Sequence, residues 1–238
     1  MVISMTAEAI PTANDGYGDL GRLLALMSGD EKHDPSAYST LDVLWVLYDR
    51  VLDVDPSRID DPDRDRFLLS KGHGPMAYYA VLGAKGFLDV ADLRSFGRYR
   101  SRLGFHPDRV LVPGVEISSG SLGHGLPLGV GAALGLRAQG ITGPRVVVLV
   151  GDAELDEGSN HEAIAYAGAI GLENLTVVAI DNASSTHGWP GGIDRRFAVE
   201  GWATAVVDGR DHDGLADAFQ DHGNGRPSAV VAHLERKA

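Results

Sequence analysis

The second half of the chain places oxygen-bearing side chains directly after two apolar runs. Gly151 and Asp152 follow the run 145–150, and Asn182 follows the run 175–180. Asp152 and Asn182 are thirty positions apart, about one strand–helix–strand unit, so both side chains can reach one edge of a parallel sheet. Carboxylate, amide and backbone carbonyl oxygens are ligands that Mg²⁺ prefers. The N–H groups that open the helix after Gly151 would favour a diphosphate beside such a metal.

Each of these two residues also has an ordinary structural explanation. Asp152 could cap a helix and Asn182 could form a turn, and both are common uses of these side chains. Taken singly, each residue is better explained in that way. The spacing of the pair favours a metal and diphosphate site.

Histidines offer a second kind of chemistry. His73 lies in the Gly/Pro-rich segment 71–75, and His106 lies in the extended segment 101–113. Imidazole titrates near neutral pH, which suits proton transfer to and from hydroxyl groups. A lone histidine is more often a surface or core residue, so a role for these two depends on the segments around them.

The pattern of apolar runs predicts the frame that positions these residues. Apolar runs predict buried strands over 67–70, 145–150, 175–180, 204–208 and 228–233. Helical spacing predicts helices over 20–27, 41–52, 76–83, 90–96, 157–170 and 212–220. Alternating strands and helices indicate an α/β fold, a parallel sheet with helices on both faces. We expect one domain over residues 20–238, preceded by a flexible arm over 1–19.

Glycines crowd the segment between residues 120 and 135. Their spacing does not match a phosphate-binding P-loop, which ends in Gly-Lys-Ser/Thr. Gly129, Gly131 and Gly135 superficially resemble a dinucleotide-binding motif, but that motif must follow a strand, and a helical Ala/Gly/Leu pattern surrounds them here. We interpret these glycines as small residues that allow close helix packing.

Composition narrows the function. The 238 residues carry a formal net charge of -12, which argues against sequence-independent nucleic-acid binding. The chain has no cysteine, which excludes disulfides, thiolate metal sites and cysteine nucleophiles, and a cytoplasmic location is expected. We expect neither a targeting segment nor a membrane span, because no window of the sequence holds the ~18 apolar residues that a span needs.

Together these segments resemble the transketolase family of thiamine-diphosphate enzymes. Gly151-Asp152-Ala153 and the later Asn182 are similar to the family's Gly-Asp-Gly…Asn motif, with alanine in place of the second glycine. The segments 69–74 and 104–108 look like its histidine segments, and 113–125 looks like its Pro-Gly-Val-Glu…Gly-Gln-Gly segment. His33 falls where the family has Gly-His-Pro-Gly. The blocks follow the family order, and the resemblance covers about residues 20–233.

The resemblance implies a thiamine-diphosphate-binding (PP-domain) fold with thiamine diphosphate and Mg²⁺, or another divalent cation such as Ca²⁺ or Mn²⁺. The implied metal ligands are Asp152, Asn182 and the backbone carbonyl of Ser184. The implied cofactor contacts are His73, Gly120, Ser121, Leu122, Gly151, Asp152, Ala153, Glu154, Glu157 and Asn182. The residues implied to face substrate hydroxyls and move protons are His33, His73 and His106. Glu157 and Glu162 are implied near a dimer interface.

The activity implied is two-carbon ketol transfer from a ketose or ketose phosphate to an aldehyde. In the family, a pyrimidine-binding domain supplies the glutamate that activates the cofactor and the arginines that bind sugar phosphates, and this sequence covers one α/β domain. A separate C-terminal transketolase-like subunit is therefore the implied partner, in an α2β2 heterotetramer. Two alternatives remain: an α-type chain of another split thiamine-diphosphate enzyme acting on a 2-oxo acid, and a non-catalytic cofactor-binding remnant.

Besides Ala153, two more places depart from the family pattern. His124 replaces a glutamine, and the segment 184–192 does not match the sequence that is usual in the family. That segment could shape a different acceptor pocket or could be only a Gly-rich turn.

Overall fold

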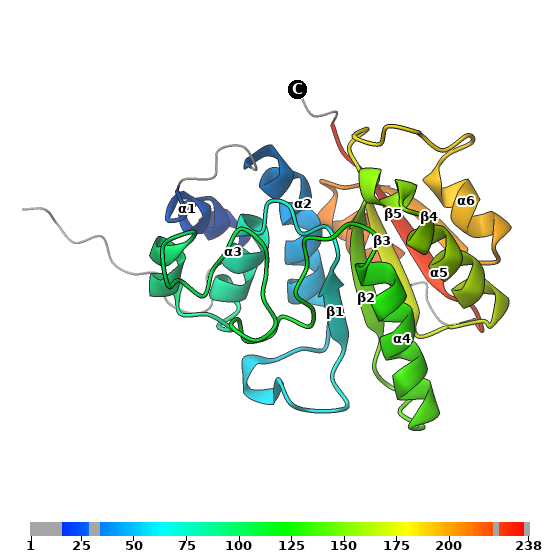
Figure 1. Cartoon of the computed structure of the whole chain (residues 1–238), viewed down its shortest axis with the longest axis horizontal. Helices are drawn as coiled ribbons and strands as arrows, with labels where there is room; N and C mark the ends of the chain where they lie inside the picture. The colour runs from blue at the N-terminus through cyan, green and yellow to red at the C-terminus, as the bar shows by residue number, and fades with distance from the viewer. Residues whose placement is uncertain (1–15, 29–33, 221–223, 236–238) are drawn as a thin grey trace, which may run out of the picture.

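Five parallel strands form the centre of the molecule, in the order β1-β2-β3-β5-β4. The computed structural model describes residues 16–28, 34–220 and 224–235. The strands are β1 (Arg66–Leu69), β2 (Val146–Gly151), β3 (Leu175–Asp181), β4 (Ala203–Asp208) and β5 (Ser228–His233). Figure 1 shows the sheet between two groups of helices. The predicted α/β fold with a parallel sheet is confirmed.

Each face of the sheet packs against its own helices. On one face, α2 (Asp34–Val46), α3 (Met76–Ala84) and α7 (His212–Ala218) share a hydrophobic cluster with Val147 and Leu149 of β2. On the other face, α4 (Gly125–Ala138), α5 (Gly158–Ala169) and α6 (Ile193–Val199) pack against Val146, Val148 and Val150 of the same strand. Because successive side chains of a strand point to opposite faces, a strand covered on both sides is a continuous apolar run.

Parallel pairing brings the ends of the central strands to one edge. Gly151 at the end of β2 is in register with Ile180, the penultimate residue of β3. The backbone N–H of Asp152 continues this ladder and donates to the carbonyl of Ile180 at 3.0 Å. The residues that follow the two strands therefore start from adjacent points, as the sequence predicts.

Several elements differ from the sequence-based expectations. The helix expected over 41–52 begins earlier, because α2 starts at Asp34, and it ends in the π-helical segment Leu47–Val51. The segment expected as a helix over 90–96 is a 3₁₀ helix, Val90–Ser95. Helix α6 was not predicted, since its sequence is short and half polar. No helix within the described ranges is long and apolar enough to cross a membrane.

The N-terminal segment is described from residue 16 onward. Within the arm expected over 1–19, Tyr17–Asp19 form a 3₁₀ turn that leads into α1 (Leu20–Ala25). The Tyr17 hydroxyl donates to the buried carboxylate of Asp42 at 2.5 Å. This part of the arm is therefore attached to α2. Residues 1–15 lie outside the described residues.

The glycines of α4 serve two different purposes. A Cβ added to Gly125 would lie 2.2 Å from Ser70 Cβ, and one added to Gly129 would lie 2.4 Å from Val148 Cγ2. At Gly131 and Gly135 an added Cβ meets nothing within 4 Å. The interpretation as close-packing residues is confirmed for Gly129 and is wrong, within this chain, for Gly131 and Gly135.

This contrast predicts opposite effects of two alanine substitutions in one helix. Gly129→Ala should lower the free energy of unfolding by ~1–3 kcal/mol, because the new methyl group overpacks against β2. Gly131→Ala should raise it by ~0.5–1 kcal/mol, because alanine is the better helix former. Urea denaturation of the two variants measures both values. Equal destabilisation by both would contradict the close contact of α4 with the sheet.

Candidate functional site

Asp152 and Asn182 lie together beyond the ends of β2 and β3. Both side chains are buried, with 1% and 4% of their surface exposed. Asp152 Oδ2 accepts the backbone N–H groups of Ser184 at 2.6 Å and Ser185 at 3.1 Å, and Oδ1 accepts the Ser184 hydroxyl at 2.5 Å. The segment that follows Asn182 is thus held against Asp152. The structure brings the three predicted metal ligands, Asp152, Asn182 and Ser184, to one place.

The donor set at this place fits a hard cation. Asn182 Oδ1 is buried and accepts no hydrogen bond from the described residues, and an unsatisfied buried oxygen costs free energy. A divalent cation between this oxygen and the Asp152 carboxylate would satisfy it. The described residues contain no group of three or more His, Asp or Glu side chains that could hold a metal. A cation here would therefore need further oxygens, such as those of a diphosphate and a backbone carbonyl.

The turn after β2 provides a small, partly cationic surface. Lys71 lies beside Gly151, and its Cδ and Cε would be 3.3 and 3.4 Å from a Cβ added to that glycine. The Lys71 ammonium donates to Ser39 Oγ at 2.9 Å. The N–H of Ala153 is engaged by Asp152 Oδ1 at 2.8 Å, so Ala153 would contact a diphosphate through other atoms. Sequence reasoning missed Lys71, although the residue lies two positions before His73.

His73 and His106 meet although they come from separate loops. Their ring centroids are 5.5 Å apart in an edge-to-face arrangement, and both side chains are exposed. His106 packs on Gly120, where an added Cβ would lie 2.8 Å from its Cδ2. Gly120 also has a φ of 130°, which favours glycine. A Cβ on Gly72 would in turn lie 2.7 Å from the Gly120 nitrogen. These close approaches assemble the two imidazoles and Gly120, while His33 lies outside the described residues.

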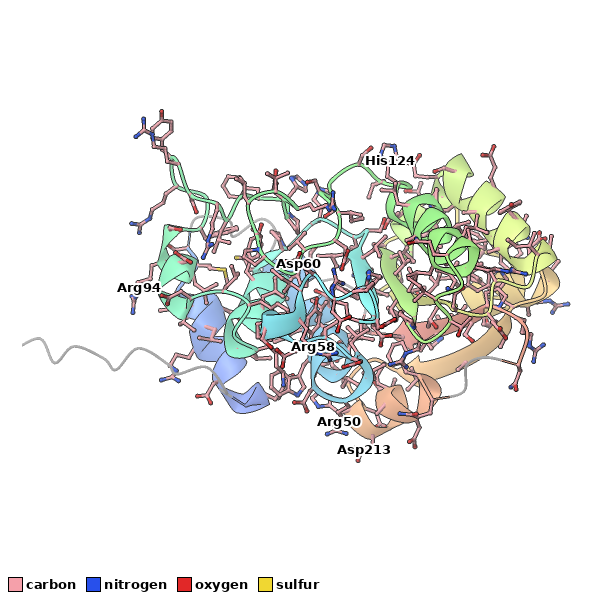
Figure 2. The ribbon with its side chains drawn as sticks, turned by 90° about the horizontal axis from the view of Figure 1, so that it is seen from below. Arg50, Arg58, Asp60, Arg94, His124 and Asp213 are labelled. Carbon is pink, nitrogen blue, oxygen red and sulfur yellow. The ribbon has the colours of Figure 1, made fainter. Side chains whose placement is uncertain are left out.

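The remaining predicted contacts are on the surface around α4 and α5. The exposed residues of this group are Ser121, Leu122, His124, Glu157 and Glu162. Figure 2 shows His124 at the beginning of α4, directed away from the body of the molecule. These side chains are accessible, and Ser121 directly follows Gly120, on which His106 packs.

Glu154 differs from its neighbour Glu157. Its side chain is 1% exposed and accepts hydrogen bonds from the Ser70 hydroxyl, from Gly123 N–H at 3.0 Å and from Gly151 N–H at 3.4 Å. Burial raises the pKa of the Glu154 carboxyl, and these hydrogen bonds oppose the shift. The family motif implied that Glu154 contacts the cofactor. Its carboxylate is instead buried and hydrogen-bonded to the protein, so it is not placed for such a contact.

The segment 184–192 folds back on the turn after β2. The Asp156 carboxylate accepts the Ser185 hydroxyl at 3.0 Å and the backbone N–H of Thr186 at 3.2 Å. The ring of Trp189 stacks on His161 of α5, with centroids 5.1 Å apart. A cavity of about 370 Å³ lies between this segment and α6. The segment thus packs against the turn after β2 and against α5, beside the candidate metal ligands.

Known proteins resemble this chain in sequence over most of its length. The family model described as "Transketolase, thiamine diphosphate binding domain" matches residues 21–233. A protein of Rhodococcoides fascians named "Ferredoxin fas2" is 57% identical over 222 residues, which are 93% of this chain and 73% of that protein. One of the subunits of the apulose-4-phosphate transketolase of Actinobacillus succinogenes is 34% identical over 213 residues, which are 87% of this chain and 77% of that protein.

Solved structures show the same fold. The transketolase from Leishmania mexicana superposes on this chain with a TM-score of 0.74 at 25% identity. The match covers 92% of this chain but 36% of the solved one, so this chain spans little more than a third of that transketolase. Sequence and structure agree on the same segment, and this chain belongs to the transketolase family as a thiamine-diphosphate-binding domain.

Proposed function

We propose that this chain is the subunit of a two-chain transketolase-type enzyme that holds the diphosphate of thiamine diphosphate through a divalent cation, with Mg²⁺ as the first choice. The observation that carries the proposal is the buried, unsatisfied Asn182 Oδ1, on the segment that the Asp152 carboxylate holds through Ser184 and Ser185. Membership in the transketolase family indicates thiamine diphosphate as the cofactor. The side-chain oxygens of Asp152 and Asn182 are of the kind that would bind its divalent cation. Ser184, held on Asp152, would add its backbone carbonyl.

The reaction proposed is two-carbon ketol transfer between a ketose, or its phosphate, and an aldehyde. When bound, thiamine diphosphate supplies the carbanion chemistry of this transfer, and the protein orients it. Asp152, Asn182 and Ser184 would anchor the metal, and Lys71 would add positive charge near Gly151. His73 and His106 would bind the substrate hydroxyls and move protons at them, for which exposed imidazoles are suited.

A separate chain with the pyrimidine-binding domain is the proposed partner. Support comes from the Actinobacillus succinogenes relative, which is named as one subunit of a transketolase and of which this chain covers 77%. The exposed surface around Ser121, Leu122 and Glu162 offers a place for such a chain to dock. An α2β2 assembly in the cytoplasm is the arrangement we propose, because the sites of this family lie between subunits related by two-fold symmetry.

A second candidate is oxidation of a 2-oxo acid with electrons passed to an iron–sulfur protein. One observation favours it: a relative at 57% identity is named a ferredoxin. Iron–sulfur clusters of ferredoxins are held by cysteine thiolates, and this chain has no cysteine. In this alternative the cluster would belong to another protein, and this chain would hold the thiamine diphosphate.

One set of assays distinguishes the two candidates. The chain, its partner, thiamine diphosphate and Mg²⁺ are supplied either with a ketose phosphate and an aldehyde, or with a 2-oxo acid and a one-electron acceptor. Ketose formation in the first mixture supports transketolase activity. Acceptor reduction that depends on the 2-oxo acid, without ketose formation, supports the alternative. No turnover in either mixture, although the cofactor binds, would contradict both.

The histidine pair should affect turnover far more than folding. His73→Ala or His106→Ala should lower turnover by ~10²-fold, the size of effect typical of proton transfer. Both side chains are exposed, so the melting temperature should change little. Tyr99→Ala, at a 91% exposed aromatic side chain outside the candidate site, is the control. If the two variants melt well below the wild type while their folded fraction turns over normally, the histidines are structural.

A further inference from the structure

A buried carboxylate occupies the junction of three loops at the candidate site. Glu154 lies in the 3₁₀ segment Ala153–Asp156, immediately after β2, with its side chain 1% exposed. Removing a carboxylate from water is costly unless hydrogen bonds compensate for the lost solvation. A glutamate at this position must therefore be stabilised by specific hydrogen bonds. Its hydrogen-bond partners indicate what the charge does there.

The partners of Glu154 come from all three loops. Gly125 N–H donates to Ser70 Oγ at 2.9 Å, and the Ser70 hydroxyl donates to Glu154 Oε1. The same oxygen accepts Gly123 N–H, and Oε2 accepts Gly151 N–H. One side chain thus joins the end of β1, the loop before α4 and the turn after β2. Every partner is a donor, which suits an ionised carboxylate because it has only acceptor atoms.

Each of the three loops carries candidate site residues within three positions of its contact with Glu154. His73 follows Ser70 by three residues, Gly120 precedes Gly123 by three, and Asp152 follows Gly151 directly. The loops also touch one another, since Gly72 leaves no room for a Cβ beside the Gly120 nitrogen. A shift of one loop would therefore move the histidine pair and the proposed metal ligands relative to each other.

We infer that Glu154 is a positioning residue, which fixes the loops of His73 and Gly120 against the Gly151–Asp152 turn and makes no contact with the cofactor itself. This inference rests on the proposed function. Glutamine at this position would keep the size of the side chain but replace one acceptor by an NH₂ group. That group would face the backbone N–H of Gly123 or of Gly151, two donors against each other, so the loops could not all keep their present places.

The test compares Glu154→Gln with Asp65→Asn, which changes another buried carboxylate that does not touch the three loops. Asp65 is 4% exposed, lies immediately before β1, and accepts the backbone N–H groups of Asp53 at 3.0 Å and Arg145 at 2.7 Å. Thiamine diphosphate affinity is measured by calorimetry with Mg²⁺ and the partner chain present, and melting temperature is measured on the same samples. Glu154→Gln should weaken cofactor binding by roughly tenfold or more, the effect of disrupting a hydrogen bond to a charged group. Asp65→Asn should lower the melting temperature and leave the affinity unchanged.

Ser70→Ala provides a second variant in case Glu154→Gln does not fold. It removes only the bridging hydroxyl and should weaken cofactor binding by about threefold or more, in keeping with the loss of one hydrogen bond. Unchanged cofactor affinity in both variants, or in Ser70→Ala when Glu154→Gln is unfolded, overturns the inference. An equal loss of affinity in Asp65→Asn also overturns it, because the effect would then be general destabilisation. Failure of the wild type to bind thiamine diphosphate would instead reject the proposed function.

Discussion

Replacing Asp152 with asparagine should weaken binding of thiamine diphosphate in the presence of Mg²⁺ by at least ~100-fold. Removing a residue that only hydrogen-bonds to a metal ligand typically costs ~10- to 100-fold in metal affinity, and removing a charged ligand itself should cost at least as much. Asp152 is the only acidic side chain that we propose as a metal ligand. Asparagine keeps the shape of the side chain and removes the negative charge. The protein would then offer only neutral oxygens to a doubly charged cation, and the diphosphate would be the only charged ligand.

Asp152 also holds Ser184 and Ser185, so a loss of affinity could come from a loosened loop. The dependence on Mg²⁺ separates the two causes. Wild-type affinity should rise with Mg²⁺ concentration, whereas the affinity of Asp152→Asn should stay flat; a loosened loop would weaken binding at every Mg²⁺ concentration and keep the slope. Asp181→Asn is the matched control, because Asp181 lies at the same sheet edge and its carboxylate faces His233 at 2.9 Å. A wild-type slope in Asp152→Asn would reject the metal assignment.

The sequence is sufficient for the sheet and for the edge where the candidate site lies. The valines of β2 and β3 are buried on both faces, and such strands are recognisable as apolar runs without any knowledge of their neighbours. The spacing of Asp152 and Asn182 follows from the crossover between the two strands. Helix α6, in contrast, buries mainly Ile193 and Phe197, too few apolar residues to give a periodic signal.

The internal contacts of the site could not be predicted. Ser70 and Glu154 are 84 positions apart, and no local pattern marks a glutamate that is buried from one that is exposed. The family motif placed Glu154 and Glu157 together at the cofactor, but one side chain faces the protein interior and the other faces outward. The meeting of His73 with His106 likewise depends on the course of an irregular loop. Burial and loop packing are tertiary properties, and the sequence shows them only through resemblance.

The chain by itself should show no ketol transfer, and a second chain should restore it. The matched family model is a thiamine-diphosphate-binding domain, and this chain spans 36% of a solved transketolase. The family resemblance implies that a glutamate from the pyrimidine-binding domain must face the cofactor's aminopyrimidine ring before the cofactor becomes reactive. The candidate site is also open to solvent, because the imidazoles of His73 and His106 are exposed. A cofactor bound beside them would be in contact with water unless another chain covered it.

The surface over α4 and α5 is suited to a protein partner. Leu122, Leu128 and Tyr166 are 37%, 50% and 51% exposed, and they lie on or next to α4 and α5, which pack side by side. Gly131 on α4 leaves open space outside the helix, so another backbone could approach closely. Obligate interfaces often bury more than ~2,000 Å² and are apolar. We therefore expect the isolated chain to self-associate, and the complex with its partner to be the well-behaved species.

The decisive measurement is ketose formation from a ketose phosphate and an aldehyde, with thiamine diphosphate and Mg²⁺, for each chain alone and for the mixture. Only the mixture should turn over, and its rate should saturate as partner is added to a fixed amount of this chain. A mixture containing Asp152→Asn should be inactive at ordinary cofactor concentrations, which shows that the activity comes from this chain and not from a contaminating host transketolase. Full turnover by the wild-type chain alone that is lost in Asp152→Asn would contradict the two-chain proposal. It would mean that this chain supplies every residue that the cofactor needs for the reaction.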